Sequence, residues 1–365
     1  KKKPILPFIP GQDSAKLITL SLVGDLMCHK PQSSNAKKAD GTYDFNPCFA
    51  YVKPYLSKAD LTIGNLETTF GGPQLPYAGY PAFNSPDDYA KALKENGFDF
   101  LCTANNHSMD TGEEGILRTL EIVKKNGLGY TGTFTSGADH DSLRILTIKG
   151  IKLGILNYTY GTNGSYPKSE HKYMLNVIDS ATITDEVSRI KQAGAELVLV
   201  FYHFGVENAA EPTQAQKDAV KFAWQAGAQL IIGAHPHVIG PTKWLAPYGT
   251  NRDSSFVAYS LGNFISNQYW RYTDAGVILS LNIQKSADGR ISVKSASYLP
   301  TWVYRAEKPA MKQHIVLPCE LANDKDKLPG FIDSSLIKKM AEAAEDTKII
   351  MTKYGGGLSL TPLDK

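Results

Sequence analysis

The sequence predicts an α/β protein in which two β-sheets pack together and helices cover their outer faces. Six short apolar runs alternate in part with four segments that have helical apolar spacing. Alternation of strands and helices is typical of βαβ units with parallel strands. Two further pairs of apolar runs surround the turns Lys149-Gly150 and Asp288-Gly289, which predicts two β-hairpins in the same mixed sandwich.

The six apolar runs predict buried strands, because β-branched and other apolar residues dominate each of them. In chain order they are LITLSLVGD (17–25), ADLTIGN (59–65), FDFLCTA (98–104), AELVLVFYH (195–203), AQLIIGAH (228–235) and SFVAYSLGN (255–263). Each run ends in polar residues, and these clusters are candidate functional groups.

Four segments between the runs predict helices. They are DDYAKALKENG (87–97), GILRTLEIVKKNG (115–127), ATITDEVSRIKQAG (181–194) and TQAQKDAVKFAWQAG (213–227). Each ends in glycine, the residue that most readily adopts the left-handed backbone at a helix C-terminus. One more helix is predicted near SSLIKKMAEAAED (334–346), beyond the point where the strand pattern weakens.

These patterns divide the chain into three parts. Residues 1–16 are polar and contain prolines and glycine, which predicts a tail or linker. Residues 17–300 form the predicted main domain, and residues 301–365 a C-terminal helical extension packed on it. The first residue is not Met, so we expect a processed chain from which an N-terminal signal or anchor segment is absent.

Composition excludes some classes of protein. The 365 residues are 42% hydrophobic, which permits a full core, and no apolar run approaches the ~20 residues needed to span a bilayer. The chain has 39 Lys and Arg against 36 Asp and Glu, a formal charge of +3. This excess is too small for a dedicated nucleic-acid-binding protein, so no nucleic acid is expected as a partner. The four cysteines lack CxxC spacing and predict no disulfide framework.

Five of the predicted strands lead into clusters that contain titratable or amide side chains. The clusters are Gly24 to Met27, Gly64 to Glu67, Asn105 to Asp110, His203 to Glu207, and His235-Pro236-His237. Because the carboxyl ends of parallel strands meet at one edge of a sheet, we expect the clusters to converge. Carboxylate, imidazole and amide oxygen form the mixed ligand set that suits Zn, Mn or Fe, so the sequence predicts a metal centre.

The two histidines of His235-Pro236-His237 carry a more specific prediction. Along an extended backbone, residues i and i+2 point the same way, and proline favours an extended conformation in the residue before it. We therefore expect both imidazoles to face a metal pair. Two ions about 3.5–4 Å apart could hold the oxygens of a phosphoester, which predicts phosphoester hydrolysis.

Each cluster also has an ordinary structural explanation. Asp25 could be a turn residue, Glu67 could lie at a helix cap, and His203 could be a hydrogen-bonded core histidine. The joint occurrence of five clusters after strands favours the metal centre. Three other residues are interpreted as having no role in the site, namely Cys28 as a packed or surface thiol, His29 as a surface imidazole and Asn163 as a loop residue.

An ordered series of motifs resembles a known family. The series is VGDLM, GNLETTF, AFNSPDDYAKALKENGFDFLCTANNHSMDTGEEGILRTL, VFYHFGVE, GAHPHVIGP and YSLGNFI. It is similar, over roughly residues 17–300, to the CapA family of poly-γ-glutamate capsule biosynthesis proteins, which includes the PgsA-type proteins. That family resembles a branch of the calcineurin-like metallophosphoesterase superfamily. The resemblance implies a four-layer αββα sandwich with a binuclear metal site between the sheet edges.

Residue by residue, the resemblance implies two sets of metal ligands. The first metal would be bound by Asp25, Glu67 and His237, with Glu67 as a possible bridge, and the second by Asn106, His203 and His235. The family pattern usually begins Asp-x-His, whereas Met27 stands here, and GNLE replaces the expected Gly-Asp. The first metal site is therefore expected to be the poorer one.

The resemblance also implies groups around the ligands. His107 would be the general acid that protonates the leaving oxygen, oriented by Asp110. Glu207 would support His203 or contact substrate. Three more residues are expected to bind substrate or support the ligands, namely Asn65, Asn263 and Arg271. Aromatic-rich loops at 71–86 and 267–274 are expected to form the substrate walls, and Arg271, in the second loop, could bind an anion or simply lie on the surface.

The sequence is compatible with two functions. The first is a hydrolase or transferase with one or two divalent metals (Mn, Zn or Fe) that acts on a phosphoester or γ-glutamyl bond in capsule or cell-envelope metabolism. The second is a non-catalytic scaffold that binds or helps export an acidic polymer. Either function implies an extracytoplasmic, envelope-associated protein whose partners are an anionic small molecule or polyglutamate, together with a membrane-bound capsule synthase complex.

Overall fold

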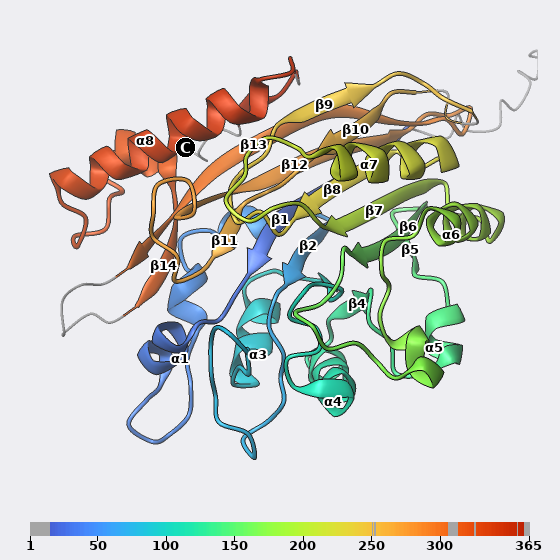
Figure 1. The fold of residues 1–365 in the computed structure, drawn as a ribbon. Helices are drawn as coiled ribbons and strands as arrows, with labels where there is room; N and C mark the ends of the chain where they lie inside the picture. Colours follow the sequence, from blue (N-terminus) through green and yellow to red (C-terminus); the bar gives the residue numbers. More distant parts are fainter. Residues whose placement is uncertain are drawn as a thin grey trace, which may run out of the picture.

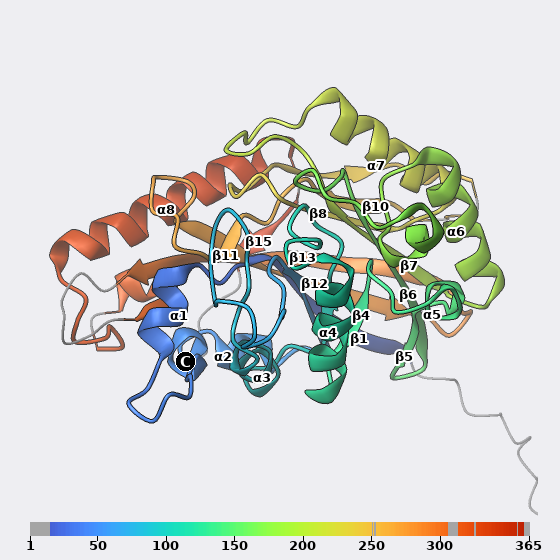
Figure 2. The ribbon, with the colours of Figure 1, turned by 60° about the horizontal axis from the view of Figure 1, so that its bottom comes forward.

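Two β-sheets packed face to face form the centre of the molecule (Figures 1 and 2). The computed structural model describes residues 15–249, 251, 253–305, 313–324, 326–355 and 357–360. Most of the expected N-terminal tail therefore lies outside the described residues. No helix in these ranges combines the length and the apolar character needed to cross a membrane.

The larger sheet has the strand order β14-β13-β12-β1-β2-β3-β4, with β11 beside β1 and β15 beside β13. Its strands are β1 (Lys16–Leu26), β2 (Leu61–Leu66), β3 (Phe100–Cys102), β4 (Gly129–Thr131), β11 (Asn263–Ile265), β12 (Ala275–Lys285), β13 (Ile291–Arg305), β14 (His314–Pro318) and β15 (Ser359–Leu360). Strands β1 to β4 are parallel, whereas β12, β13 and β14 pair in antiparallel fashion.

The smaller sheet has the order β5-β6-β7-β8-β10-β9. Its strands are β5 (Ile145–Ile148), β6 (Ile151–Thr159), β7 (Leu197–His203), β8 (Leu230–Ala234), β9 (Thr242–Leu245) and β10 (Ser255–Ala258). Strands β6, β7, β8 and β10 are parallel. Alternation along β7 sends Leu199 and Phe201 to the core between the sheets and Val198 and Val200 to the core under the helices.

Helices cover the outer faces of both sheets. The α-helices are α1 (Lys30–Ala36), α2 (Lys53–Leu56), α3 (Asp88–Glu95), α4 (Gly112–Lys125), α5 (Gly137–Asp141), α6 (Ser180–Gln192), α7 (Gln214–Ala226) and α8 (Ser334–Thr352). The 3₁₀ helices are η1 (Asn46–Phe49), η2 (Ser169–Met174) and η3 (Cys319–Asn323). Figures 1 and 2 show α1 to α4 on one side of the molecule and α6 and α7 on the other.

The buried side chains of the described residues form separate cores between these layers. One core lies between the two sheets, one between the larger sheet and α3 and α4, and one between the smaller sheet and α6 and α7. The layer order is therefore helix, sheet, sheet, helix, which confirms the predicted αββα sandwich. Both predicted hairpins are present as the antiparallel pairs β5–β6 and β12–β13.

The C-terminal part departs from the expected boundary at residue 300. That residue lies inside β13, and β14 continues the larger sheet beyond it. The sheet thus extends into the segment that was expected to be a helical extension, because apolar residues of 301–305 and 314–318 complete its edge. Helix α8 is longer than predicted and packs on β12, β13 and η3.

Candidate metal centre

Parallel strands of both sheets end at one edge and bring the polar clusters together. Asp25 lies near the end of β1, Glu67 follows β2, His203 is the last residue of β7, and His235 follows β8. All four residues are buried. The convergence follows from the parallel pairing, since strands that run the same way deliver their carboxyl ends to the same edge.

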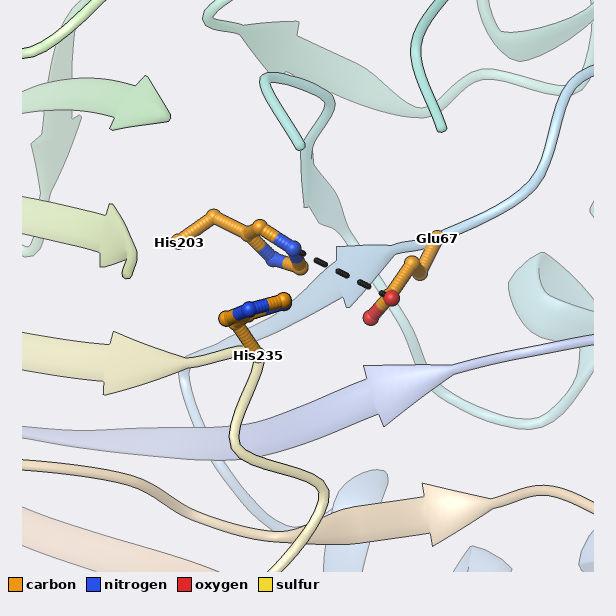
Figure 3. Close-up of side chains that lie close together, drawn as sticks. All are labelled: Glu67, His203 and His235. Atoms are coloured by element: carbon orange, nitrogen blue, oxygen red, sulfur yellow. Dashed lines mark ion pairs between the residues drawn. The ribbon is translucent and has the colours of Figure 1, made fainter. Parts of the chain in front are cut away.

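Glu67 belongs to two overlapping groups of side chains that could hold a metal ion. One consists of Glu67, His203 and His235, and the other of Asp25, Glu67 and His237; within each, the ligand atoms lie within 4.8 Å of one another. Glu67 Oε1 is 3.9 Å from His203 Nε2 and 3.8 Å from His237 Nε2. Figure 3 shows His203 and His235 directed toward the Glu67 carboxylate.

Asn106 joins the first of these groups. Its Oδ1 lies 2.8 Å from His203 Nε2, and its side chain is buried. We call Asn106, His203 and His235 the histidine half of the centre. The carboxylate half consists of Asp25, Asn65 and His237, and Glu67 is shared by the two halves.

The carboxylate half is already connected internally. Asp25 Oδ2 lies 3.0 Å from His237 Nδ1, and Asp25 Oδ1 accepts a hydrogen bond from Asn65 Nδ2 at 2.8 Å. Asn65 Nδ2 also lies 3.2 Å from Glu67 Oε2 and 3.2 Å from His203 Nδ1. Asn65 thus occupies the middle of the centre, where GNLE replaces the Gly-Asp expected from the resemblance.

Several buried polar atoms of the centre have no hydrogen-bond partner. Among the described residues they are Asn65 Oδ1, Glu67 Oε1, His235 Nδ1 and Asn263 Oδ1. Buried polar atoms without partners are costly and rare in folded proteins, so their concentration here needs an explanation. Carboxylate oxygen, amide oxygen and imidazole nitrogen are ligands for a divalent transition metal, and the residues present therefore fit such an ion.

Electrostatics agree with this fit. Burial lowers the pKa of His235 to about 4, helped by the neighbouring His237, so the ring is neutral at neutral pH. Burial also lowers the pKa of His203 well below its usual value. Burial alone would raise the pKa of Asp25, but the hydrogen bond and charge of His237 hold this pKa below its usual value. Burial and the charge of Asp25 raise the pKa of Glu67 well above its usual value. A cation at Glu67 would relieve this repulsion.

His107 and Asp110 form a hydrogen-bonded pair beside the ligands. His107 Nδ1 is 2.7 Å from Asp110 Oδ2, and the same oxygen accepts the Phe83 backbone N–H at 2.6 Å. The Phe83 ring packs edge-on against His107 at 4.7 Å, and Asn105 Oδ1 accepts the His107 backbone N–H. These contacts fix the imidazole, with its Nε2 as the nitrogen that does not face Asp110.

The backbone of His235-Pro236-His237 differs from the prediction. His235 has φ 98° and His237 has φ 60°, so neither residue is extended. Both imidazoles nevertheless join the centre, because a left-handed turn after β8 directs them there instead of strand alternation. Proline in the sequence favours an extended predecessor, but the tertiary structure overrides this local preference.

Three residues near the centre were missed or misinterpreted. Asn163, interpreted as a simple loop residue, lies within hydrogen-bond distance of Asn106 and His107. Tyr160 packs on His235 with ring centroids 4.7 Å apart. His29 is not a free surface imidazole, since its Nδ1 is 3.2 Å from Gln32 Oε1 and its ring packs on Phe83. No motif marked these residues; their only signal was a position after a strand that ends at this edge.

The remaining candidates lie at different distances from the ligands. Glu207 is exposed and groups with His235 and His237. Asn263 pairs with Asp25 across β11 and β1, and its Nδ2 donates to Gln268 Oε1 and to the Thr273 carbonyl.

The Arg271 side chain contacts α8. Its guanidinium donates to Asp346 at 2.8 and 2.9 Å and pairs with Glu342 at 3.2 Å, both on α8, so carboxylates of the chain already occupy the proposed anion contact.

A family model provides the deciding comparison. The model described as bacterial capsule synthesis protein PGA_cap matches residues 19–268, more than half of the chain. The chain belongs to this family. All the candidate ligands lie within the matched range, and this confirms the family that the motif series predicted.

Two curated relatives agree with this membership. The PGA biosynthesis protein CapA of Bacillus subtilis (strain 168) is 26% identical over 323 residues, which cover 85% of this chain and 79% of the relative. The capsule biosynthesis protein CapA of Bacillus anthracis is 26% identical over 284 residues, covering 76% of this chain and 66% of the relative. The chain therefore spans slightly less than two thirds of the second relative.

Solved structures similar to this PGA_cap protein include phosphoesterases. The NAD nucleotidase NadN of Haemophilus influenzae has a TM-score of 0.49 at 15% identity, over 96% of this chain and 58% of that chain. The calcineurin-like phosphoesterase YfkN of Bacillus subtilis has a TM-score of 0.44 at 12% identity, over 91% of this chain and 98% of that chain. Both TM-scores are below 0.5, so the family assignment depends on the sequence match.

Proposed function

We propose that this PGA_cap protein is a metal-dependent phosphoesterase whose substrate is an anionic ester of capsule or cell-envelope metabolism. One observation carries the proposal: the Glu67 Oε1 atom is buried without a hydrogen-bond partner and lies between the rings of His203 and His237. A hydrogen-bonded His107–Asp110 pair stands beside this cluster. Ligands and a candidate proton donor are thus present together.

The two halves would hold different ions. One ion would be bound by the histidine half, that is Asn106, His203 and His235, with Glu67 as a further ligand. The other ion would be bound by Asp25, His237 and the same Glu67. The ligand chemistry suits Mn, Zn or Fe. When bound, divalent ions would polarise the phosphoryl group and lower the pKa of a water molecule.

His107 would supply the proton for the leaving group. Hydrolysis forms a P–O bond from water and breaks the P–O bond to the leaving oxygen, which needs a proton. His107 Nδ1 is directed to Asp110, so its Nε2 is the atom that can hold and deliver this proton. Asp110 would keep the ring oriented.

The test combines metal content with turnover. Purified protein would be analysed for Mn, Zn and Fe, and then assayed against phosphomonoesters, phosphodiesters and γ-glutamyl peptides. We expect bound metal, hydrolysis of a phosphoester, and a loss of about 10²–10⁴-fold in kcat for His107→Ala with metal content retained. Metal-loaded protein without phosphoesterase activity, or His107→Ala with unchanged kcat, would overturn the proposal. If the protein hydrolyses γ-glutamyl peptides but no phosphoester, the substrate class is γ-glutamyl amides instead of phosphoesters.

A non-catalytic scaffold is the second candidate, and one observation favours it. Asn65 Nδ2 contacts Asp25, Glu67 and His203 at a position where a bridging carboxylate would serve catalysis better. On this alternative, the centre would bind polyglutamate for a membrane-bound synthase at the cell envelope; the names of the two CapA relatives refer to PGA biosynthesis and capsule biosynthesis. Polyglutamate retention by the wild type, compared before and after chelation, tests it; no retention in either state would reject it.

A further inference from the structure

The loop that follows β6 brings one residue against both parts of the candidate site. Asn163 lies in this loop and is exposed, whereas Asn106 and His107 are buried. The loop is anchored by backbone and side-chain contacts. The Tyr160 backbone N–H donates to the His203 carbonyl at 2.9 Å, and Thr159 Oγ1 donates to the Gly161 carbonyl at 2.8 Å.

Two hydrogen bonds connect Asn163 to Asn106. The Asn163 backbone N–H donates to the Asn106 carbonyl at 3.0 Å, and Asn163 Oδ1 accepts from Asn106 Nδ2 at 3.2 Å. A carboxamide has an acceptor on one side and donors on the other, so a partner for Nδ2 fixes its orientation. With Nδ2 held by Asn163, Asn106 presents Oδ1 to His203 and the histidine half.

The other end of the same amide reaches His107. Asn163 Nδ2 lies 3.3 Å from His107 Nδ1 and 3.4 Å from His107 Nε2. The two distances are nearly equal, so the amide nitrogen packs against the ring between its two nitrogens and leaves Nε2 available to hold the proton for the leaving group. Asp110 therefore holds the ring through a hydrogen bond at Nδ1, and Asn163 holds it by packing against it.

The two contacts require an amide at this position. Asn106 Nδ2 needs an acceptor, the His107 ring has an amide NH₂ packed against it, and the two residues are adjacent in the chain. The short carboxamide of asparagine provides both groups from one side chain. A carboxylate would provide only the acceptor, and an aliphatic side chain would provide neither.

We infer that Asn163 is a positioning residue that orients the metal ligand Asn106 and the general acid His107 together. The inference rests on the proposed function for the role of His107, but not for the orientation of Asn106. Asn163 would act on metal binding through Asn106 and on turnover through His107. Substitutions that remove one contact should therefore separate the two effects.

Asn163→Ala, Asn163→Asp and the control Ser165→Ala, in the same loop, provide the test. Metal affinity would be measured by calorimetric titration of the full chain with Mn²⁺ or Zn²⁺, and kcat and KM with the phosphoester found by the substrate panel. Asn163→Ala should weaken metal binding by about 10–100-fold and lower kcat by a similar factor. Asn163→Asp keeps the acceptor for Asn106, so metal affinity should stay near that of the wild type while kcat falls. KM should change little in both variants.

Several outcomes would overturn the inference. Unchanged metal affinity and kcat in Asn163→Ala would show that neither contact matters, as would losses no greater than those of Ser165→Ala. Equal metal affinities for the Asp and Ala variants, both reduced, would reject the Asn106 contact. If the wild type binds metal but hydrolyses no substrate, the proposed function fails, whereas the metal titrations still decide the role of Asn163. If Asn163→Ala does not fold, Asn163→Asp and the control supply the comparison.

Discussion

The two halves of the metal centre differ in how far they satisfy their own polar atoms. In the carboxylate half, Asp25 binds His237, Asn65 and the backbone of His235, so both carboxylate oxygens have partners. In the histidine half, His235 Nδ1 is buried without one. Asn65 Oδ1 in the carboxylate half also lacks a partner, so the difference lies in the charged and imidazole ligands: the Asp25 carboxylate is fully paired without an ion, whereas the His235 ring is not.

This difference predicts the order of metal binding. An ion in the carboxylate half would compete with the hydrogen bonds of both Asp25 oxygens. An ion in the histidine half would compete with the hydrogen bond between His203 Nε2 and Asn106 Oδ1, but it would also supply the partner that His235 Nδ1 lacks. We therefore expect the histidine half to bind the tighter ion. The departures at Met27 and GNLE predicted the same order from sequence. The structure adds the internal pairing through Asn65, which no motif revealed.

The largest effect is expected for Glu67→Gln, because Glu67 is shared by both halves. Burial and the charge of Asp25 raise the pKa of Glu67 well above its usual value and so disfavour the carboxylate when no cation is present; the neutral glutamine of the same shape should therefore be tolerated in the metal-free protein. Both ions should be lost, with affinities reduced by more than the ~10–100-fold typical of residues behind the ligands. Elemental analysis after dialysis checks this; retention of one ion would show that Glu67 serves only one half.

The next effect compares His235→Ala with His237→Ala. Each variant should lose one ion and keep the other, since the two rings belong to different groups around Glu67. His235→Ala should lose the tighter ion and His237→Ala the weaker one. Metal titration of the two variants, monitored by calorimetry, measures which affinity disappears. Loss of both ions in either variant would contradict the division into halves.

Asn65→Asp should act in opposite directions on the metal-free and metal-loaded protein. The new carboxylate would lie among Asp25, Glu67 and His203, where an uncompensated buried charge costs about 3–5 kcal/mol. The midpoint of thermal unfolding should therefore fall in chelator. Metal should restore it, because a third carboxylate strengthens the carboxylate half. If added metal does not raise the midpoint above that of the metal-free variant, Asn65 does not face a metal position.

Much of the fold was predictable from sequence because its signals are local. Lys149 and Gly150 both have positive φ in the turn between β5 and β6, as the predicted hairpin requires. The apolar runs identified the strands that carry the ligands. The sequence pattern identified the first part of β13 in the hairpin at Asp288-Gly289, but not its continuation through residue 300 to Arg305, which pairs with the separate strand β14.

The candidate site was less predictable because side-chain contacts and turn geometry leave no periodic signal. His235 and His237 were identified as neighbours, but their left-handed backbone depends on tertiary structure. Asn163 is separated from Asn106 by 57 residues, and only folding brings them together. For the same reason, Arg271 seemed free in the sequence, although α8 lies close enough to pair with it.

Arg271→Ala is expected to have the smallest effect and completes the comparison, because Arg271 belongs to neither half. Its exposed guanidinium is already neutralised by Asp346 and Glu342, and exposed pairs of this kind contribute little to stability. Metal affinity should be unchanged, and KM for an anionic substrate should stay within about twofold, since an exposed charge that is already paired adds little. Asp346→Asn is the matched control, because it leaves the arginine but weakens the pair. A rise in KM of about tenfold, equivalent to roughly 1.4 kcal/mol, in Arg271→Ala alone would mean that the guanidinium leaves α8 to bind substrate.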